Sequence, residues 1–440
     1  MRRSAPPRAH RSRLAAAERA LPSSMWHATA GPSVAASTLT GPVTADVLVI
    51  GGGFNGISAA LRLAQNGADA VLLEAGEIGE GASGRNAGMV NPGQFLGPAE
   101  IRAVLGAGHA ETFLAELGGA PALVGELIEA HGIACHADFR PVIRAAHDSA
   151  SAKLLERQCD DWQALGQPVE MARDDDLAAL TGSTRWAAAM LDRRGFTIQP
   201  LAFVRGLAWA AQEAGARLYQ ESRVTGLARD GAAWCATTAS GHEVRAGKVI
   251  LSTNAYTGAL HPAFSDPLVT SGAFGVASRP LPDAARERIL PQGHSLYDTH
   301  RIPLFFRFDP DRRLMVGSLG FLSDGARAPQ AWAQRVIDRL WPGLPPLDWS
   351  HVWQGTLGLT SHGMPRLISP EEGLIGTVGC NGRGIAPNCY FGRMLADIAL
   401  GRDCPMPLPV ETGAPYPARA LRRDAMDAAM RLYRNTFLLN

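Results

Sequence analysis

Lysine is scarce in this chain: Lys153 and Lys248 are the only two in 440 residues, and arginine supplies the rest of the positive charge. Basic and acidic residues number 42 and 41, so the net charge is close to zero. A chain without an excess of positive charge has no general attraction for nucleic acid or for an anionic membrane surface. We therefore expect a small-molecule substrate and no nucleic-acid partner.

Cysteine pairs and long apolar runs are also missing. The six cysteines lie far apart and none belongs to a C-x-x-C pair, which argues against a metal cage or a disulfide framework. No apolar run approaches the roughly 18 residues that a membrane-spanning helix requires. Reduced thiols, no metal site and no membrane span together predict a cytoplasmic protein.

The N-terminal segment 1–24 is rich in arginine and poor in acidic residues, a composition shared by mitochondrial transit peptides and disordered leaders. Arg2 and Arg3 also match the start of a twin-arginine export signal, but the apolar stretch of such signals does not follow. We interpret 1–24 as a disordered extension or as the product of an early start codon, with Met25 as the alternative start.

A strand, a helix and a second strand follow one another between residues 45 and 74. Residues 45–50 (ADVLVI) form a nearly continuous apolar run, typical of a parallel strand buried on both faces. From 55 to 66 apolar residues recur at helical spacing, and Gly67 follows as a C-cap. Residues 70–74 form the second strand, which completes one βαβ unit.

Three glycines, Gly51, Gly53 and Gly56, join the first strand to the helix in a G-x-G-x-x-G pattern. In this context the first allows a tight turn, the second lets a pyrophosphate approach the backbone, and the third lets the helix pack on the strand. The helix N-terminus adds partial positive charge for the phosphates. Glu74 ends the second strand, where its carboxylate can accept the ribose hydroxyls and would repel the 2′-phosphate of NADP. The pattern predicts a bound dinucleotide other than NADP.

The segment 79–90 (GEGASGRNAGMV) is a loop of glycine and small residues directly after the ribose acid. Its backbone amides, with Ser83, Arg85 and Asn86, can line a phosphate and a flavin edge that a nicotinamide cofactor does not need. A plain surface loop is the alternative interpretation. We favour FAD as the cofactor.

The remaining segments differ in pattern. Helical spacing dominates from 98 to 192, strands and helices alternate from 200 to 260, and alternating residues from 267 to 348 indicate an antiparallel sheet. We predict an α/β fold with a doubly wound, Rossmann-like FAD domain and a second α+β substrate domain built on a mixed or antiparallel sheet. The predicted division is 44–97, 195–265 and 350–405 for the FAD domain, 98–194 and 266–349 for the substrate domain, and 406–440 for a C-terminal tail and helix.

The segment VIGGGFNGISAALRLAQNGADAVLLEAGEIGEGASGRNAGMV, residues 49–90, resembles the N-terminal signature of the D-amino-acid oxidase superfamily of FAD enzymes, which includes glycine and sarcosine oxidases. Further segments resemble its gamma-glutamylputrescine oxidase type. They are PSSMWHATAGP (22–32), LSTNAYTGAL (251–260), LYDTHRIPLFFRFDPDRRLMVGS (296–318), WQGTLGLTSHGMPRL (353–367) and GCNGRGIAPNCYFGRMLAD (379–397). The resemblance runs from about residue 22 to the C-terminus.

The resemblance implies FAD-binding roles along the chain. Val224 is expected to meet the adenine through its backbone, and Thr253 and Asn254 to lie near the pyrophosphate. The turn 382–385 is expected to offer amides to the pyrimidine end of the flavin, where negative charge builds when hydride arrives. The predicted cofactor residues are Gly51, Gly53, Phe54, Asn55, Gly56, Glu74, Ala75, Ala82, Ser83, Gly84, Arg85, Asn86, Gly88, Val224, Thr253, Asn254, Gly382, Arg383, Gly384 and Ile385.

Several positions depart from the family patterns. Gly355 stands where monomeric sarcosine oxidases attach FAD through a cysteine, so we expect non-covalent FAD. Ala386 stands where those enzymes place a functional lysine. Pro387 and Asn388 replace small and hydroxyl residues beside the flavin, and His362 replaces an aspartate.

Candidates for binding the substrate are few. Arg307, set between aromatic residues in the segment FFRF, must find a partner, either the substrate or a structural ion pair. His362 is a second candidate, with a structural histidine as the alternative. Tyr256 and Tyr297 are interpreted as packing residues. No catalytic side chain is identified, since hydride transfer to flavin requires no essential base.

We expect an FAD-dependent oxidoreductase that oxidises the C–N bond of a small amine or amino acid by hydride transfer, giving an imine that hydrolyses. The acceptor that reoxidises the flavin, O2 or another, stays open. One alternative is a flavin enzyme acting on a modified nucleic acid, against which the near-zero net charge counts. Another is a catalytically impaired flavin-binding homologue, which the unusual Pro387, Asn388 and His362 bring into consideration.

Overall fold

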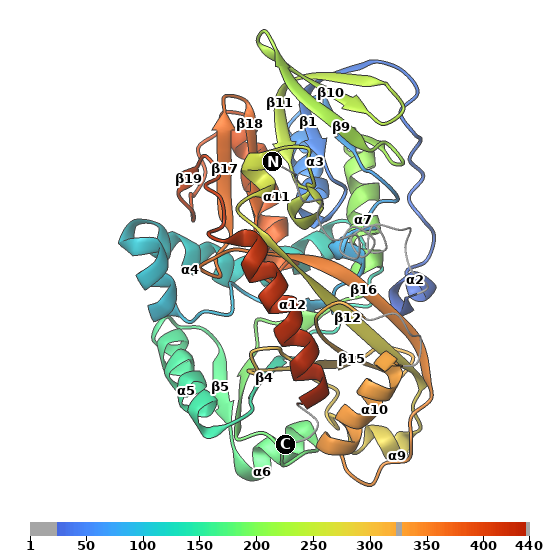
Figure 1. Cartoon of the computed structure of the whole chain (residues 1–440), viewed down its shortest axis with the longest axis vertical. Helices are drawn as coiled ribbons and strands as arrows, with labels where there is room; N and C mark the ends of the chain where they lie inside the picture. Colours follow the sequence, from blue (N-terminus) through green and yellow to red (C-terminus); the bar gives the residue numbers. More distant parts are fainter. Residues whose placement is uncertain (1–23, 323–327, 437–440) are drawn as a thin grey trace, which may run out of the picture.

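Two large β-sheets organise the part of the chain that the structure describes, residues 24–322 and 328–436 (Figure 1). In this computed structural model, a nine-stranded sheet forms one half of the molecule and an eight-stranded sheet forms the other. The predicted extension 1–24 lies outside the described residues apart from Ser24. The Ser24 hydroxyl accepts a hydrogen bond from the His27 amide (3.0 Å) and caps helix α2 (Met25–Thr29).

The predicted βαβ unit lies within the nine-stranded sheet. Strand β1 (Val43–Ile50) leads into helix α3 (Phe54–Gln65) and strand β2 (Ala70–Leu73), and β1 pairs in parallel with both β2 and β11 (Glu243–Leu251). The C-terminal half of β1 and all of β2 are buried, as expected for strands covered on both faces. The other strands of this sheet are β8 (Arg217–Tyr219), β9 (Val224–Asp230), β10 (Ala233–Thr238), β17 (Arg366–Glu371), β18 (Leu374–Val378) and β19 (Val410–Glu411).

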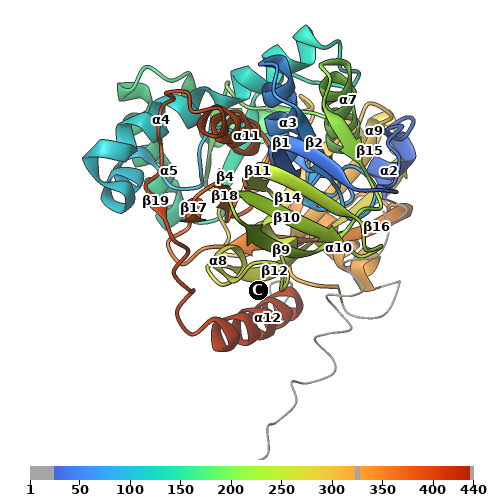
Figure 2. The same cartoon turned by 90° about the horizontal axis from the view of Figure 1, so that it is seen from above.

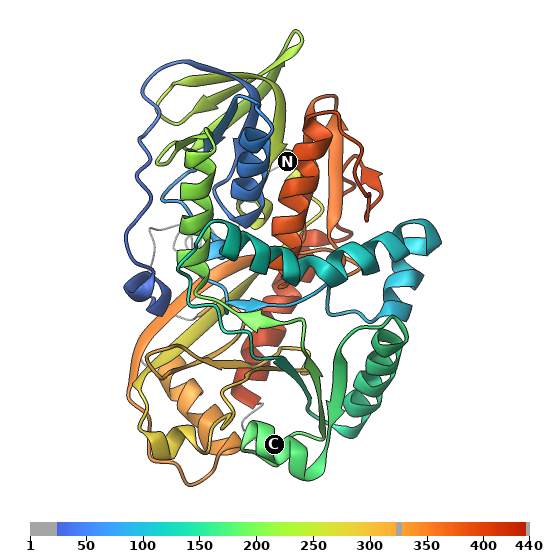
Figure 3. The ribbon, with the colours of Figure 1, turned by 180° about the vertical axis from the view of Figure 1, so that it is seen from behind.

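Helices cover one face of this sheet (Figure 3). Helix α3 packs against both α7 (Pro200–Glu213) and α11 (Ala386–Ala399). Most of α3 is buried, because it contacts the sheet on one side and a helix on each flank. Strands β9 and β10 continue antiparallel from β11 on the side away from α3 (Figure 2). The sheet order β19-β17-β18-β11-β1-β2-β8 brings the ends of β1, β11 and β18 together.

The eight-stranded sheet has the order β16-β12-β15-β14-β13-β4-β6-β5, and its pairs are antiparallel except for the parallel pair of β13 and β4. Helix α10 (Ala328–Leu340) packs on it, and Trp186, Phe306 and Trp341 form edge-to-face ring contacts in its core. Its strands are β4 (Val142–Ala146), β5 (Val169–Ala172), β6 (Ala188–Asp192), β12 (Val269–Pro280), β13 (Ser295–Asp298), β14 (Phe305–Phe308), β15 (Arg313–Leu319) and β16 (Trp349–Leu359).

Long helices join or flank the two halves. Helix α4 (Pro98–Ala130) crosses the middle of the molecule and contacts α11 and α5 (Ser149–Ala164) (Figure 3). Helix α12 (Arg419–Thr436) lies along β12 (Figure 1). The remaining elements are the ribbon of β3 (Met89–Val90) and β7 (Phe196–Thr197), α6 (Asp174–Thr181), α8 (Pro262–Ser265), α9 (Asp283–Arg286), and the 3-10 turns η1 (Ala82–Gly84) and η2 (Asn254–Tyr256).

The predicted fold class is confirmed: an α/β unit with a parallel core and a second unit on a mixed sheet. The division into domains remains our interpretation, and one boundary needs correction. Strand β16 lies almost wholly within 350–405, which we assigned to the FAD domain, yet it pairs along its length with β12 of the eight-stranded sheet. A boundary placed by local composition cannot show which distant strand a segment pairs with.

Replacing Gly56 by alanine is expected to destabilise the fold, because a Cβ atom there would overlap the carbonyl oxygen of Gly51. Overpacking of this kind costs about 1–3 kcal/mol in the free energy of unfolding. Thermal unfolding followed by circular dichroism measures the effect. The control is Gly119→Ala, an exposed position in α4 where a Cβ meets no atom within 4 Å. Equal losses in both variants would contradict the assigned packing role of Gly56.

Candidate functional site

A cavity of about 750 Å³ is lined by residues of both sheets. Its walls come from the turn after β1, the loop after β2, the turn before α11 and several strands of the eight-stranded sheet. The volume falls within the range of roughly 300–1,000 Å³ that ligand pockets occupy. Segments far apart in the sequence therefore share one binding space.

The glycine turn after β1 forms one wall of this cavity. Gly51 has a φ of +112°, which L side chains rarely adopt. Gly53 is the extended residue immediately before α3, and the Phe54 amide donates to the Ser83 hydroxyl (3.0 Å). The N-terminal end of α3 therefore borders the cavity, where its partial positive charge suits a phosphate.

Glu74 closes the far end of the same wall. Its carboxylate accepts hydrogen bonds from the backbone amides of Gly52 (2.5 Å), Ala75 (2.7 Å) and Gly76 (3.1 Å). Burial raises the pKa of the Glu74 carboxyl, and the three amides act in the opposite direction. Val224 also lines the cavity. The predicted ribose and adenine residues thus border one space.

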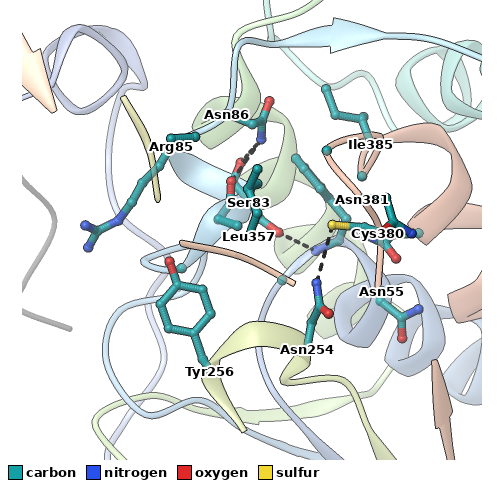
Figure 4. Close-up of a pocket in the computed structure, with 18 of the residues that line it drawn as sticks. Asn55, Ser83, Arg85, Asn86, Asn254, Tyr256, Leu357, Cys380, Asn381 and Ile385 are labelled. Atoms are coloured by element: carbon teal, nitrogen blue, oxygen red, sulfur yellow. Dashed lines mark hydrogen bonds between the residues drawn. The ribbon is translucent and has the colours of Figure 1, made fainter. Parts of the chain in front are cut away.

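The loop after β2 is held in shape by Asn86 and Arg85 (Figure 4). The Asn86 amide group donates to the Ser83 carbonyl (2.7 Å), and its oxygen accepts from the Gly88 amide (2.8 Å). The Arg85 guanidinium donates to the backbone carbonyls of Glu80 (2.6 Å) and Gln354 (3.1 Å), the latter on β16. Arg85 therefore ties the loop to the other sheet.

The C-terminal turn is positioned by Asn254 (Figure 4). The Asn254 side chain accepts from the Gly379 amide (2.9 Å) and donates to the Cys380 sulfur (3.4 Å). Gly382 has a φ of +87°, so a residue with a side chain would be strained there. Residues 380–385 of this turn line the cavity together with residues of the loop after β2.

Asn55 links the glycine turn after β1 to Ser252, which follows β11, and to Thr377 on β18. It accepts from the Ser252 hydroxyl (2.6 Å) and donates to the Thr377 hydroxyl (3.0 Å). These partners follow β11 and belong to β18, so one buried amide joins the carboxyl-terminal side of three neighbouring strands.

The structure brings the predicted cofactor residues together, with three exceptions: Gly56, Gly84 and Gly88 do not line the cavity. Each is a close-packing position instead. A Cβ on Gly84 would overlap the Gly79 carbonyl oxygen, and one on Gly88 would overlap the Ile198 carbonyl oxygen. These glycines shape the wall but do not form its surface.

Both predicted substrate residues lie elsewhere, and this prediction is corrected. Arg307 is buried (3% exposed) and donates to the backbone carbonyls of Ile198 (2.6 Å) and Gly88 (3.1 Å). Burial lowers its pKa to about 10. His362 is exposed, and its ring accepts from the Met364 amide (3.3 Å). Neither is among the described residues that line the cavity. The aromatic neighbours of Arg307 indicated burial correctly, but its partners are carbonyl groups.

Two tyrosines interpreted as packing residues line the cavity. The Tyr256 hydroxyl accepts from the Thr356 amide (3.1 Å), and the Tyr297 hydroxyl accepts from the Arg383 guanidinium. Arg144, which the sequence did not single out, lines the cavity as well. The sequence around these tyrosines does not separate packing from cavity lining. Tyr297 lies on β13, and the face that its side chain occupies depends on strand pairing, whereas Tyr256 lies in the turn η2.

Two further searches cover only residues 24–322 and 328–436. No cluster of three or more His, Cys, Asp or Glu side chains there has the arrangement of a metal site. None of the helices in those ranges has the length and apolar character needed to cross a membrane.

Comparisons with a family model, with curated proteins and with solved structures all match this chain to oxidoreductases. The family model DAO, described as FAD dependent oxidoreductase, matches residues 46–398. Gamma-glutamylputrescine oxidoreductase of Escherichia coli is 30% identical over 386 residues, covering 86% of this chain and 89% of that protein. The probable oxidoreductase OrdL of Rhizobium meliloti is 30% identical over 377 residues, covering 84% and 86%. The crystal structure of glycine oxidase from Geobacillus kaustophilus superposes with a TM-score of 0.68 at 22% identity, covering 82% and 96%.

Replacing Glu74 by alanine is expected to weaken FAD binding roughly tenfold or more, because hydrogen bonds to a charged group contribute about 1.5–3 kcal/mol. Quenching of flavin fluorescence on titration with apo-protein measures the dissociation constant. The control is Glu77→Ala in the same loop, whose side chain is 44% exposed and does not line the cavity. Unchanged FAD affinity in Glu74→Ala would show that the ribose assignment is wrong.

Proposed function

Since the chain belongs to the DAO family of FAD-dependent oxidoreductases, we propose that it oxidises the C–N bond of a small amine or amino acid. Bound FAD supplies the acceptor for hydride from the carbon next to nitrogen. The product is an imine, which water hydrolyses. One observation carries the proposal: a single cavity joins the dinucleotide-binding turn to the eight-stranded sheet, so a second ligand can lie beside the cofactor.

The C-terminal turn is suited to stabilise negative charge on the pyrimidine end of a flavin. Gly382, Gly384 and Ile385 line the cavity, and α11 begins directly after them. Backbone amides and the positive end of a helix act on charge that develops at this point. The unusual Pro387 fits this arrangement, because proline in the first turn of a helix removes no internal hydrogen bond.

The second half of the cavity is mostly apolar and suits a small substrate. Phe95, Phe274, Phe305 and Met315 line it together with Tyr297. Such walls exclude water and hold the substrate in a limited set of orientations. By orienting the substrate, these residues direct its C–H bond toward the cofactor. Orientation is the way in which they increase the reaction rate.

We also infer that FAD is held without a covalent bond. Gly355 lies on β16 with Arg85 beside it and offers no attaching side chain. Cys380 lines the cavity, but burial raises the pKa of its thiol and disfavours the reactive thiolate. Acid precipitation is therefore expected to release all of the flavin, measured by absorbance of the supernatant. Flavin that stays with the precipitate would contradict this inference.

An anaerobic screen of amines and amino acids tests the proposed reaction. A substrate is expected to bleach the absorbance band of the oxidised flavin, and free FAD with the same compound serves as the control. Gamma-glutamylputrescine and glycine represent the chemistries named for two relatives, and sarcosine and D-amino acids represent those of the superfamily that the sequence resembles. If dithionite bleaches the bound flavin and no amine or amino acid does, the proposal fails and a catalytically impaired homologue is favoured.

A further inference from the structure

A small cavity of about 10 Å³ lies behind the C-terminal turn and adjoins the large cavity of about 750 Å³. We propose that the small cavity binds one ordered water molecule through the Gln94 side chain and the Nε–H group of Arg383. This water holds the Arg383 guanidinium in place at the wall of the large cavity. The inference concerns the site of the cofactor and goes beyond the proposed reaction.

The wall between the small and the large cavity consists of residues that line both. They are Asn254, Thr377, Cys380, Arg383 and Asn388. Figure 4 shows Asn254 and Cys380 of this wall from the side of the large cavity. Gln94 lines the small cavity and not the large one, and it comes from the segment between β3 and α4. A molecule bound in the small cavity therefore supports the wall from behind.

Gln94 is the side chain whose surroundings indicate a ligand. It is 4% exposed, and neither its amide nitrogen nor its amide oxygen has a hydrogen-bond partner within residues 24–322 and 328–436. A buried amide without hydrogen bonds destabilises a fold, so nearly all such groups are bonded to protein or to water. The amide has both donors and an acceptor. Its complement is therefore a small molecule that both accepts and donates.

Arg383 provides a donor at the same small cavity. Two nitrogens of its guanidinium donate to the Pro92 carbonyl (2.7 Å) and to the Tyr297 hydroxyl. The third, Nε–H, is buried and has no hydrogen-bond partner in the described part of the chain. The guanidinium carbon also lies 4.6 Å from the centre of the Phe95 ring. The segment before α4 thus contacts Arg383 through a carbonyl, through a ring and through the water bound to Gln94.

Water fits the small cavity better than an ion does. One water molecule requires roughly 10–15 Å³ and two to four polar partners. It accepts from the Nε–H group of Arg383 and donates to the Gln94 oxygen, and the Asn388 side chain on the shared wall can supply a third bond. A chloride ion would be attracted by the guanidinium but would leave the Gln94 oxygen without a donor. The site also gives a role to Asn388, one of the departures from the family pattern.

A crystal structure of the oxidised holoenzyme, at a resolution that shows ordered water, tests the site directly. We expect one water molecule within roughly 2.7–3.2 Å of both the Gln94 amide group and the Nε atom of Arg383. A second data set, collected after a bromide soak, shows by anomalous scattering whether a halide binds there. The proposal is overturned by a cavity without electron density, by a direct hydrogen bond from Gln94 to another protein group, or by a bromide signal.

Gln94→Met keeps the length of the side chain and removes its hydrogen-bonding groups. With a water bound, this substitution is expected to remove the water from the crystal structure and to lower the melting temperature by about 2 °C, because Arg383 loses a partner. If Gln94 had no water partner, removal of an unsatisfied buried amide would raise the melting temperature instead. A raised melting temperature therefore contradicts the water site.

The midpoint potential of the bound flavin separates positioning of Arg383 from a general loss of stability. Arg383 lines the large cavity, so a guanidinium held less firmly stabilises the negative charge of reduced flavin less, and Gln94→Met is expected to give a more negative potential. The matched control is Gln199→Met. Gln199 is 3% exposed, donates to the Trp26 carbonyl (2.7 Å) and lines neither cavity. This control is expected to lose stability with an unchanged potential.

The remaining outcomes also decide the question. A water that persists in Gln94→Met overturns the role of Gln94, and an unchanged flavin potential, or an equal shift in Gln199→Met, overturns the positioning of Arg383. FAD content establishes that each variant is folded, and if Gln94→Met loses FAD, the crystal structure of the unaltered holoenzyme decides alone. None of these measurements uses a substrate. Failure of the amine screen would therefore leave this inference intact, and its own failure would leave the proposed reaction intact.

Discussion

The close approach of helix α3 to the end of strand β1 is the contact on which the rest of the site depends. It exists because Gly56 places no side chain against the Gly51 carbonyl. The same approach brings Asn55 between Ser252 and Thr377, so the ends of three strands are joined by one buried amide. A bulkier residue at the turn would move helix α3, and with it both the helix end that borders the cavity and the link to the C-terminal turn.

Residues that are close in the sequence could be predicted well. The glycine turn, Glu74 and the loop after β2 lie within about forty residues, and strand-helix-strand periodicity places them at one edge of a sheet. The C-terminal turn is different, because only family resemblance indicated that Gly382 and its neighbours meet this edge. The local pattern also led us to assign the residues of β16 to the wrong sheet. Strand β16 pairs with β12, which is far away in the sequence.

The residues that line the cavity from the eight-stranded sheet could not be predicted from the sequence, for a physical reason. Arg144 and Tyr297 face each other only because β4 and β13 pair in parallel, and Arg383 arrives from a turn beyond both. The residues next to either strand in the sequence carry no pattern that predicts this contact. For Arg307 the sequence indicated burial correctly, but burial alone does not identify the partner, and backbone carbonyls satisfy a guanidinium as well as a ligand can.

Arg144, Arg307 and Arg383 hold their guanidinium groups at sites with little access to water, where arginine and lysine behave differently. Lysine in an apolar wall tends to lose its proton, whereas a guanidinium stays charged and keeps several donors in a fixed plane. Arg307 uses its donors on carbonyl groups, so its charge has a structural role. Arg144 and Arg383 use part of theirs on neutral acceptors and retain buried N–H groups at the cavity wall. The difference between these arginines lies in the donors that remain without a protein partner, since Nε of Arg144 and of Arg383 makes no hydrogen bond among the described residues.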